Sequence, residues 1–552
     1  MIKVLNITPE NTSMRRLFNG EFFHEQKYSF PSISFDPSEA SRFNIDLFIS
    51  TKVLPNIEID CDVILMPVSL TDNFLEVVGL RLAYHLRFTT HVNQFKPIIF
   101  ISDVKLTDVL QITELASIIY SNGCYFSDVN PESIDDILKN RILTEINKKS
   151  FDHFLRNTTL NPPANYISSH SVSNEWSITK WAEILNVNSE AISDLKEENK
   201  NLLYFKFLEK KFPPIPVKNT KFLCAGSGTV LLVDDEWDKG WSQVLEKFYS
   251  HSPSITFQTL KLTFKDQGSD EITKLTVEEI KKINPDLIIL DLRLTDQDFG
   301  EIPTNSTTGY KILKEIKEFN PGFDVVIFSA TNKLWSLMEL QKIGANGFIF
   351  KESPENVIDD DYASKGLSKL KELTESSVKK YGNKSLWDKV QIAKSSNLAI
   401  DADFLRYSSS FMDIAWNLIN SENRNYAFLT LFQIVETFAN DRYSQNDTVL
   451  RSGVSTRVYD GHTSKLKLVQ DFNNGPYLLI RDDIPSKHDP KALFKISAVC
   501  AFIFQKDNSY LKKIGVLVQL RNKVAHDGVK ISGIKELSQL LDIINLMRSN
   551  AV

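Results

Sequence analysis

Five polar side chains between residues 234 and 351 have the types and the spacing needed for phosphoryl-transfer chemistry. Asp234 and Asp235 follow an aliphatic run in LLVDDE, and Asp291 follows another in LIILDLRLTD. Ser329 ends DVVIFS, and Lys351 follows GFIF. Three carboxylates can hold Mg²⁺, a hard cation that takes oxygen ligands. One of them can then accept a phosphoryl group whose oxygens a hydroxyl and an ammonium bind, which is catalysis by positioning and electrostatics.

Parallel strands must bring these side chains together. Aliphatic runs alternate with helical segments in this part of the chain: TVLLVDDE, SITFQTL, DLIILDLRL, DVVIFSA and GFIFKES. Such alternation predicts a parallel α/β sheet. The carboxyl ends of its strands collect at one edge, where open α/β folds place their sites. Taken singly, each carboxylate could simply cap a strand end, but the ordered set favours one shared site.

The set resembles the receiver domain of bacterial response regulators, over about residues 228–356. The resemblance implies that Asp291 is the phosphoacceptor and that a sensor histidine kinase or a small phosphodonor supplies the group. It also implies Mg²⁺ at Asp234, Asp235 and Asp291, phosphoryl binding by Ser329 and Lys351, and Phe348 as the switch aromatic. Two departures lie close to the acceptor. The segment 292–308 is longer than in typical receivers, and Glu352 stands where the family usually has proline.

The same α/β pattern occurs earlier in the chain, over about residues 1–135. Four segments align in order: VILMPVSLTD with LIILDLRLTD, GLRLAYHLR with GYKILKEIK, KPIIFIS with FDVVIFS (offset by one position), and SNGCYFS with ANGFIFK. Ordered self-similarity of this kind indicates an internal repeat. In this alignment Pro67 replaces the acceptor, Ser127 replaces the lysine, and Asn6 and Ile7 fall at the acid pair. We therefore expect a pseudo-receiver that packs or docks a partner, the alternative being an unrelated α/β domain.

The rest of the chain is predicted to be helical. Residues 141–220 form either a helical linker or a small helical domain, and apolar residues from 380 to 552 recur at the spacing of core-facing helices. The predicted fold class is therefore multidomain α/β plus all-α. It has two flavodoxin-like doubly wound parallel sheets, at 1–140 and 228–356, and a C-terminal helical bundle at 380–552.

A second candidate site lies in RNKVAHD, residues 521–527. Asn522 and His526 are four apart and share a helical face, while Arg521 is offset by about 100°. The pattern resembles the motif of HEPN domains, which implies a homodimer and, in some members, metal-independent RNA cleavage. His526 would then be general acid/base, Arg521 would stabilise charge and Asn522 would orient groups. The alternative is a set of helix-end caps favoured by the dipole, and Glu436 is expected to be a solvated or paired surface acid more than part of the groove.

Composition and motifs exclude several other classes of protein. Four scattered cysteines without CxxC spacing argue against zinc and favour a reduced, cytoplasmic protein. There is no secretory signal and no apolar run long enough to span a membrane. We find no basic recognition helix for DNA and no Gly-rich nucleotide loop.

The predicted function is a two-component response regulator with an RNA-cleaving dimeric output. The alternative is a non-catalytic dimerisation or partner-binding output, or a scaffold.

Overall fold

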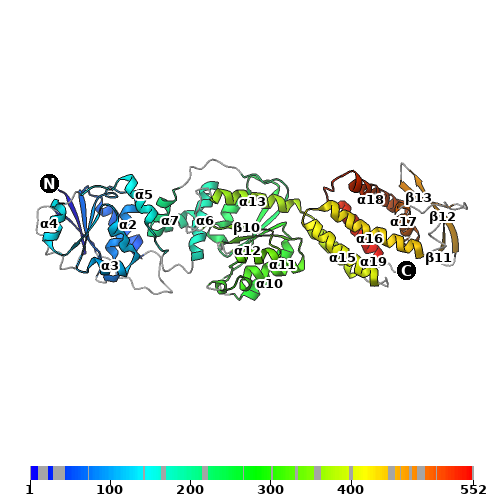
Figure 1. Cartoon of the computed structure of the whole chain (residues 1–552), viewed down its shortest axis with the longest axis horizontal. Helices are drawn as coiled ribbons and strands as arrows, with labels where there is room; N and C mark the ends of the chain where they lie inside the picture. Colours follow the sequence, from blue (N-terminus) through cyan, green and yellow to red (C-terminus); the bar gives the residue numbers. More distant parts are fainter. Residues whose placement is uncertain are drawn as a thin grey trace.

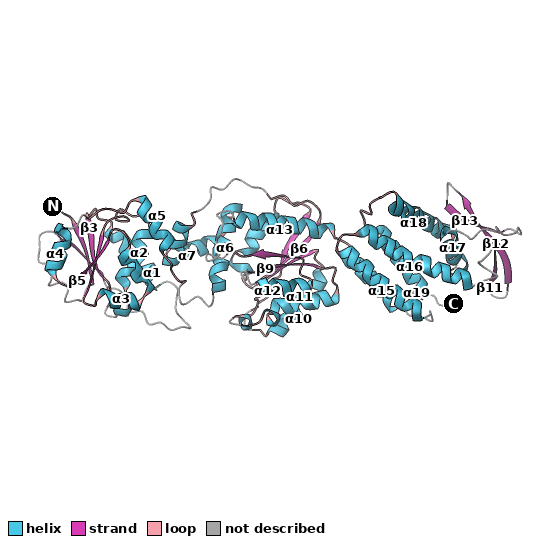
Figure 2. Cartoon of the chain, in the orientation of Figure 1, coloured by secondary structure: helices cyan, strands magenta, loops and turns pink. Residues whose placement is uncertain are grey.

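The computed structural model describes residues 2–9, 23–28, 44–71, 74–140, 143–162, 169–213, 222–264, 267–299, 302–329, 334–352, 362–396, 402–445, 454–459, 462–471, 475–480, 492–504 and 506–549. Figure 1 shows two α/β units and a group of C-terminal helices following one another along the long axis. We call residues 2–140 the first unit and residues 222–379 the second unit. Figure 2 shows a strand layer inside each unit, with helices around it.

The first unit is built on a five-stranded parallel sheet in the order β2-β1-β3-β4-β5. Its strands are β1 (Val4–Pro9), β2 (Phe23–Tyr28), β3 (Val63–Pro67), β4 (Ile98–Ser102) and β5 (Cys124–Asp128). Its helices include α1 (Asn44–Phe48), α2 (Val78–Phe88), α3 (Leu106–Ile112) and α4 (Pro131–Asn140), with a 3₁₀ helix at Glu114–Tyr120. Strands β3 and β4 are buried throughout, because helices cover both faces of a doubly wound sheet.

The second unit repeats this topology in the order β7-β6-β8-β9-β10. Its strands are β6 (Gly228–Val233), β7 (Ile255–Thr259), β8 (Leu287–Leu290), β9 (Asp324–Ser329) and β10 (Gly347–Phe350). Helices α9 (Trp241–Tyr249) and α13 (Tyr362–Lys379) pack on one face, and α10 (Ser269–Ile283), α11 (Thr308–Phe319) and α12 (Leu334–Lys342) on the other. Both sheets have the flavodoxin-like strand order, which confirms the predicted fold class.

Two glycines at equivalent positions align the units residue by residue. The N–H of Gly79 donates to the carbonyl of Val68, and the N–H of Gly309 donates to that of Leu292, both at 3.0 Å. A Cβ on Gly79 would lie 1.8 Å from the Pro67 oxygen, and one on Gly309 would lie 2.2 Å from the Asp291 oxygen. Only glycine fits so close an approach. Pro67 therefore stands where Asp291 stands in the second unit, as the sequence alignment predicted.

The strand register corrects two other equivalences. Pro67 pairs with Ile101, which pairs with Ser127, whereas Phe328 beside Asp291 pairs with Ile349. Ser127 therefore matches Ile349, and Val129 stands at the lysine position. The prediction that Ser127 replaces Lys351 was wrong by two residues, because alignment of aliphatic runs does not set the stagger between strands.

The acid pair shifts by the same amount. Asn6 pairs with Leu65, while Val233 pairs with Leu290 next to Asp291. Counting along each ladder places Thr8 opposite Pro67, at the position of Asp234. Pro9 then takes the position of Asp235. The predicted match of Asn6 and Ile7 to the acid pair was therefore two residues early. The corrected positions hold no carboxylate.

The helices between the units contribute to the cores of both neighbours. They are α5 (Lys148–Asn157), α6 (Ser169–Leu185), α7 (Glu190–Asn199) and α8 (Leu203–Lys211). Phe154 of α5 and Phe207 of α8 lie in the core of the first unit. Trp181 of α6 and Ile192 of α7 lie in the core of the second. These helices thus act as covering layers for the two sheets.

The C-terminal region contains the predicted helical bundle and an additional sheet. One core is shared by α14 (Asn383–Ser395), α15 (Ala402–Asn420), α16 (Arg424–Gln445), α17 (Ala492–Ala498), α18 (Asn508–His526) and α19 (Lys535–Ser549). The sequence had not predicted the antiparallel strands β11 (Val454–Tyr459), β12 (His462–Asp471) and β13 (Gly475–Ile480). In the described ranges no helix is long and apolar enough to cross a membrane.

A short turn joins this bundle to the second unit. Helix α13 ends at Lys379 and α14 begins at Asn383. The Lys384 ammonium donates to the carbonyls of Asn284 and Pro285, both at 2.8 Å, which precede β8. The Asn320 amide, before β9, donates to Asp388 at 3.0 Å. The bundle is therefore attached to the amino-terminal edge of the sheet, opposite the edge that carries Asp291.

Candidate functional site

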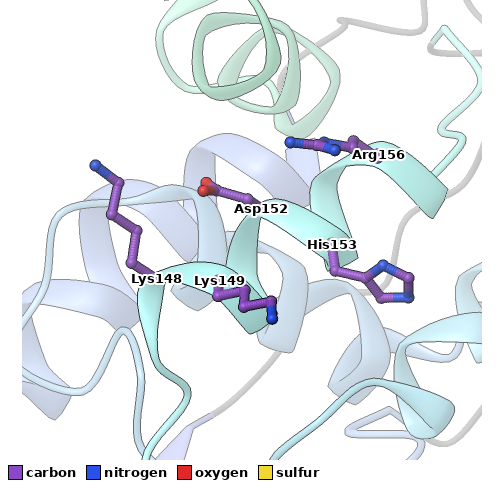
Figure 3. Close-up of a pocket in the computed structure, with 5 residues that line it drawn as sticks. All are labelled: Lys148, Lys149, Asp152, His153 and Arg156. Atoms are coloured by element: carbon purple, nitrogen blue, oxygen red, sulfur yellow. The ribbon is translucent and has the colours of Figure 1, made fainter.

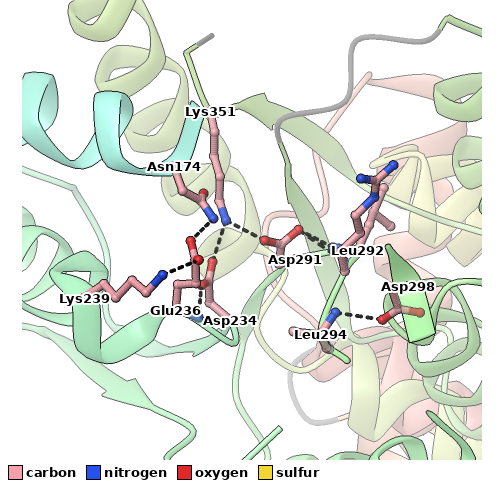
Figure 4. Close-up of polar contacts among 10 residues, drawn as sticks. Asn174, Asp234, Glu236, Lys239, Asp291, Leu292, Leu294, Asp298 and Lys351 are labelled. Carbon is pink, nitrogen blue, oxygen red and sulfur yellow. Dashed lines mark hydrogen bonds and ion pairs between the residues drawn. The ribbon is translucent and has the colours of Figure 1, made fainter. Parts of the chain in front are cut away.

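Three carboxylates meet at the carboxyl edge of the second sheet. Asp234 and Asp235 follow β6 and Asp291 follows the adjacent strand β8, so the parallel register brings them together. Their nearest oxygens all lie within 4.8 Å of one another. Asp234 and Asp291 have no exposed surface. The structure therefore brings the three predicted acids together, and Figure 4 shows Asp234 and Asp291 on either side of Lys351.

Lys351 lies between two of these carboxylates. Its Nζ is 2.9 Å from Asp234 Oδ2 and 2.5 Å from Asp291 Oδ2, and all three side chains are buried. The ammonium also lies over the rings of Phe328, at 5.0 Å, and Trp241, at 5.6 Å. Burial disfavours the charge, but Asp234 and Asp291 outweigh it and hold the pKa of Lys351 above its usual value.

Asp235 is the group that this arrangement leaves unsatisfied. Its Oδ1 is buried and has no hydrogen-bond partner among the described residues. Burial, followed by repulsion from Asp234 and Asp291, raises the pKa of Asp235. Burial also raises the pKa of Asp234, against the opposing effect of Lys351. An unpaired carboxylate oxygen beside two further carboxylates fits the oxygen coordination that Mg²⁺ requires.

The other predicted residues surround the acceptor. The N–H of Leu292 donates to Asp291 Oδ1 at 2.6 Å, which orients the acceptor carboxylate. Ser329 ends the next strand, β9, and is buried, with its carbonyl accepting from the Lys351 N–H at 3.0 Å. Phe348 lies on β10 and packs, half-buried, against the core on the α11 face. Each lies at or near the edge where the sequence placed it.

The long segment after Asp291 is fixed by Asp298. Its Oδ2 accepts from the N–H groups of Leu294, at 2.8 Å, and Thr295, at 2.9 Å. Its Oδ1 accepts from the N–H of Thr308 at 2.8 Å, in the first turn of α11. Asp298 therefore ties the described part of this segment to the helix that follows it, and Figure 4 shows its contact with Leu294.

Sequence reasoning missed two polar residues at the same edge. The N–H of Glu236 donates to Asp234 Oδ1 at 2.9 Å. The Asn174 side chain, from α6, donates to the Glu236 carboxylate. Glu236 was visible as the third acid of LLVDDE. Asn174 gave no signal, because it lies 62 positions earlier in the chain and in a different element.

In the described part of the first unit, the positions equivalent to the acids and to Lys351 hold no carboxylate and no cation. Thr8, Pro9 and Pro67 occupy the positions of the three acids, Ser102 that of Ser329, and Val129 that of Lys351. Proline has no nucleophilic side chain. These equivalent positions therefore supply neither an acceptor nor carboxylate ligands for a hard cation.

The predicted C-terminal residues are only partly brought together. Arg521 Nη2 lies 3.3 Å from Glu436 Oε2, and Arg521 Nη1 lies 3.2 Å from Asn522 Oδ1. The guanidinium also lies 6.0 Å from the centre of the Phe432 ring. Asn522 and His526 are exposed on α18. Across the described ranges, no hydrogen bond or ion pair connects His526 with Arg521.

A surface pocket elsewhere has a different character. It is lined by Lys148, Lys149, Asp152, His153 and Arg156, all on α5. Figure 3 shows these side chains leaving the helix in different directions. Side chains of one helix that diverge in this way do not converge on a common atom. We regard this surface as a solvated charged face.

The strand order of both α/β units and the acidic edge of the second define their class as receiver-type domains. Residues 14–127 match the family model described as inactive receiver domain. Residues 269–362 match the family model of the response regulator receiver domain. The second match includes Asp291, Ser329 and Lys351. The first agrees with the loss of every charged site residue from that edge.

Three solved structures resemble parts of the chain. NtrX from Brucella abortus is 19% identical, with 34% of this chain and 35% of that chain covered and a TM-score of 0.20. The receiver domain of NtrX from the same organism is 20% identical, with 27% and 97% covered and a TM-score of 0.18. A two-component response regulator of the LuxR family from Aurantimonas sp. SI85-9A1 is 15% identical, with 26% and 97% covered and a TM-score of 0.17.

The chain thus spans about a third of the length of the full NtrX structure that it matches. No curated protein sequence matches the chain.

Proposed function

We propose that this chain is a phosphorylation-controlled signalling protein in which Asp291 accepts a phosphoryl group. The observation that carries the proposal is the buried acidic cluster with Lys351 bonded to Asp291 and with Asp235 Oδ1 unpaired. Unusual protonation equilibria of this kind concentrate at functional sites. The family match of residues 269–362 supports the same conclusion.

The proposed reaction is the transfer of a phosphoryl group to a carboxylate oxygen. A bond forms between an Asp291 oxygen and phosphorus, while the bond from phosphorus to the donor breaks and the donor leaves with that electron pair. A histidine kinase would supply the group from a phosphorylated imidazole. Bound Mg²⁺, held by Asp234, Asp235 and Asp291, would offset the charge of the incoming group. Lys351 would leave the Asp291 oxygen and bind phosphoryl oxygen, with the Ser329 hydroxyl donating to another.

Intact-mass measurement after incubation with phosphoramidate and Mg²⁺ tests this proposal. We expect one added phosphoryl group on the wild-type chain and none on Asp291→Asn. Lys351→Ala should accept the group more slowly. Asp298→Asn is a useful comparison because it alters the neighbouring segment but leaves all three acids in place. Modification that survives Asp291→Asn would place the acceptor elsewhere.

For the output we propose that the C-terminal helices form a HEPN-like module that acts on RNA as a homodimer. The exposed Asn522 and His526 beside the cationic Arg521 support an RNA-facing surface. Within the described part of one chain Arg521 forms an ion pair with Glu436, and no ion pair or hydrogen bond joins it to His526. The Arg and His of a cleaving site would therefore have to come from two copies of the chain. The alternative is a non-catalytic dimerisation or partner-binding module.

RNA cleavage by the purified chain separates these outputs. Cleavage lost in both Arg521→Ala and His526→Ala supports the nuclease. The exposed Arg406→Ala, whose ion pair lies on α15, serves as the control. A dimer that cleaves no RNA with or without phosphodonor supports the non-catalytic module.

A further inference from the structure

The first turns of α6 lie against the acidic edge although this helix comes before the second unit in sequence. Asn174 is fully buried, and its Nδ2 donates to Glu236 Oε2. Its Oδ1 has no hydrogen-bond partner among the described residues. Glu236 in turn pairs with Lys239 at 2.7 Å and donates its N–H to Asp234. Figure 4 shows the Asn174 amide pointing toward the group formed by Asp234, Asp291 and Lys351.

A second hydrogen bond joins α6 to the residue after Lys351. The buried Ser177 hydroxyl donates to the Glu352 carbonyl at 2.9 Å. Glu352 is itself buried, and burial raises its pKa. This is the residue that departs from the proline usual in receivers. Helix α6 is therefore bonded to both sides of the site, through Glu236 after β6 and through Glu352 after β10.

Helix α6 packs closely against the second unit. The ring of Trp181 packs 5.6 Å from that of Trp241 and 5.7 Å from that of Phe328. These two rings also surround the Lys351 ammonium. A Cβ on Gly366 of α13 would come within 3.0 Å of the Trp181 ring, so glycine there makes room for the indole. Contacts this close resist small displacements of the helix.

The same turn of α6 also contributes to the hydrophobic core that the first unit shares with α5 and α8. Trp176 is buried in the hydrophobic core of the first unit. Its ring lies 6.3 Å from the ring of Phe212, which follows α8. Asn174 stands two residues before Trp176, and Ser177 stands one residue after it. One helical turn therefore connects the core of the first unit with the acceptor edge of the second.

We propose that this turn, with Asn174, Trp176 and Ser177, is a latch that restrains phosphorylation of Asp291 and reports it to the first unit. The inference rests on the proposed function of Asp291. A phosphoryl group would add negative charge beside Asp234 and Glu236 and draw Lys351 away from them. Lys351 would then move from the rings of Phe328 and Trp241, on which Trp181 packs. The backbone of Glu352, which accepts from Ser177, would shift with it and loosen α6. Since coupling between two sites is reciprocal, a latch that phosphorylation loosens must also oppose phosphorylation while it is closed.

Two measurements on the full chain test the latch. Intact mass with phosphoramidate and Mg²⁺ gives the rate of phosphorylation of wild type, Asn174→Ala and Ser177→Ala. Asp194→Asn is the control, because Asp194 is exposed on α7, a helix that packs on the same core. Hydrogen exchange over residues 174–181, with and without beryllofluoride and Mg²⁺, reports whether the helix loosens.

We expect Asn174→Ala to accept the phosphoryl group several-fold faster than wild type and Asp194→Asn to match wild type. Beryllofluoride should increase exchange over α6 in wild type and leave Asp291→Asn unchanged. If Asn174→Ala is insoluble, Ser177→Ala and the exchange data decide. Wild-type rates in both variants with unchanged exchange would overturn the latch and leave the proposed function intact. Failure of wild type and both variants to be phosphorylated would remove the proposed function and the latch with it.

Discussion

Pro67 and Asp291 occupy the same position in two copies of one fold. The carbonyl oxygen of each residue lies against a glycine. A Cβ added to Gly79 would lie 1.8 Å from the Pro67 oxygen, and one added to Gly309 would lie 2.2 Å from the Asp291 oxygen. The backbone geometry after β3 and after β8 has thus been kept, while the side chain that performs the reaction is present in only one copy. A fold can persist without its chemistry because packing and site residues are separate requirements.

Gly309→Ala and Gly79→Ala should each destabilise their own unit by about 2–4 kcal/mol, because the new Cβ would clash with backbone that cannot move independently. Denaturant unfolding with limited proteolysis would assign the loss to one unit or the other. Gly268→Ala is the control, since a Cβ there meets nothing within 4 Å. Equal effects at all three positions would contradict the proposed close approach.

Pro67→Asp should not make the first unit a phosphoacceptor. The neighbouring positions hold Thr8, Pro9 and Val129, so a new aspartate would find neither a second acid for Mg²⁺ nor a lysine. We expect one phosphoryl group by intact mass in this variant, and none when it is combined with Asp291→Asn. A second group would show that the first unit retains reaction machinery.

Mg²⁺ should stabilise the second unit more at pH 8 than at pH 5. The folded-state pKa of Asp234 and of Asp235 is raised, so the folded state holds these protons more tightly than the unfolded state. Stability without metal therefore falls as pH rises from the ordinary carboxyl pKa through the raised values. A cation bound to the folded state relieves the repulsion among the carboxylates. At a concentration of a hundred times Kd, binding stabilises the folded state by about 2.7 kcal/mol.

Asp235→Asn provides the check on that expectation. Removing one of three crowded carboxylates should raise the thermal midpoint of the second unit in the absence of metal and abolish the response to Mg²⁺. Thermal unfolding at pH 5 and pH 8, with Mg²⁺ or with a chelator, measures both effects. A variant that still responds to Mg²⁺ as wild type does would remove Asp235 from the cation site.

The first unit should lose stability in mild acid through His85. Burial lowers the pKa of His85 to about 4, although Asp46, at 2.8 Å from its Nε2, opposes the shift. Asp46 is already paired with Arg81 and accepts from the N–H of Leu203. Because the unfolded chain takes up the proton first, stability should decrease by about 2 kcal/mol between pH 7 and pH 5.

His85→Gln tests that pH dependence directly. Glutamine can still donate to Asp46 but does not titrate, so the slope of stability against pH over this interval should flatten. Denaturant unfolding followed by a probe of the first unit gives the slope. An unchanged slope would assign the acid sensitivity to another group.

The sequence predicted those features that aliphatic runs and local motifs determine. The runs ending at Asp234, Asp291 and Ser329 were sufficient to predict two parallel sheets and the acidic edge of the second. Strand stagger was not predictable, because a shift of two residues keeps every side chain on its own face. For this reason Ser127 was matched to Lys351 when Val129 holds that position.

The missed features have physical reasons of their own. In the sequence Asp460-Gly461 separates β11 from β12, and Asn474-Gly475 stands where β13 begins; both are dipeptides favoured in hairpin turns. That local signal was outweighed by the helical pattern on either side. Asn174 reaches the acidic edge only because α6 packs on the second sheet. A tertiary contact of this kind leaves no pattern in the sequence around the residue.

The most direct test of the account is the intact mass of the wild-type chain and of Asp291→Asn after incubation with phosphoramidate and Mg²⁺. We expect a single added phosphoryl group on wild type, lost on removal of Mg²⁺ from the incubation and absent from Asp291→Asn. An unmodified wild-type chain, or a modification that persists in Asp291→Asn, would contradict it.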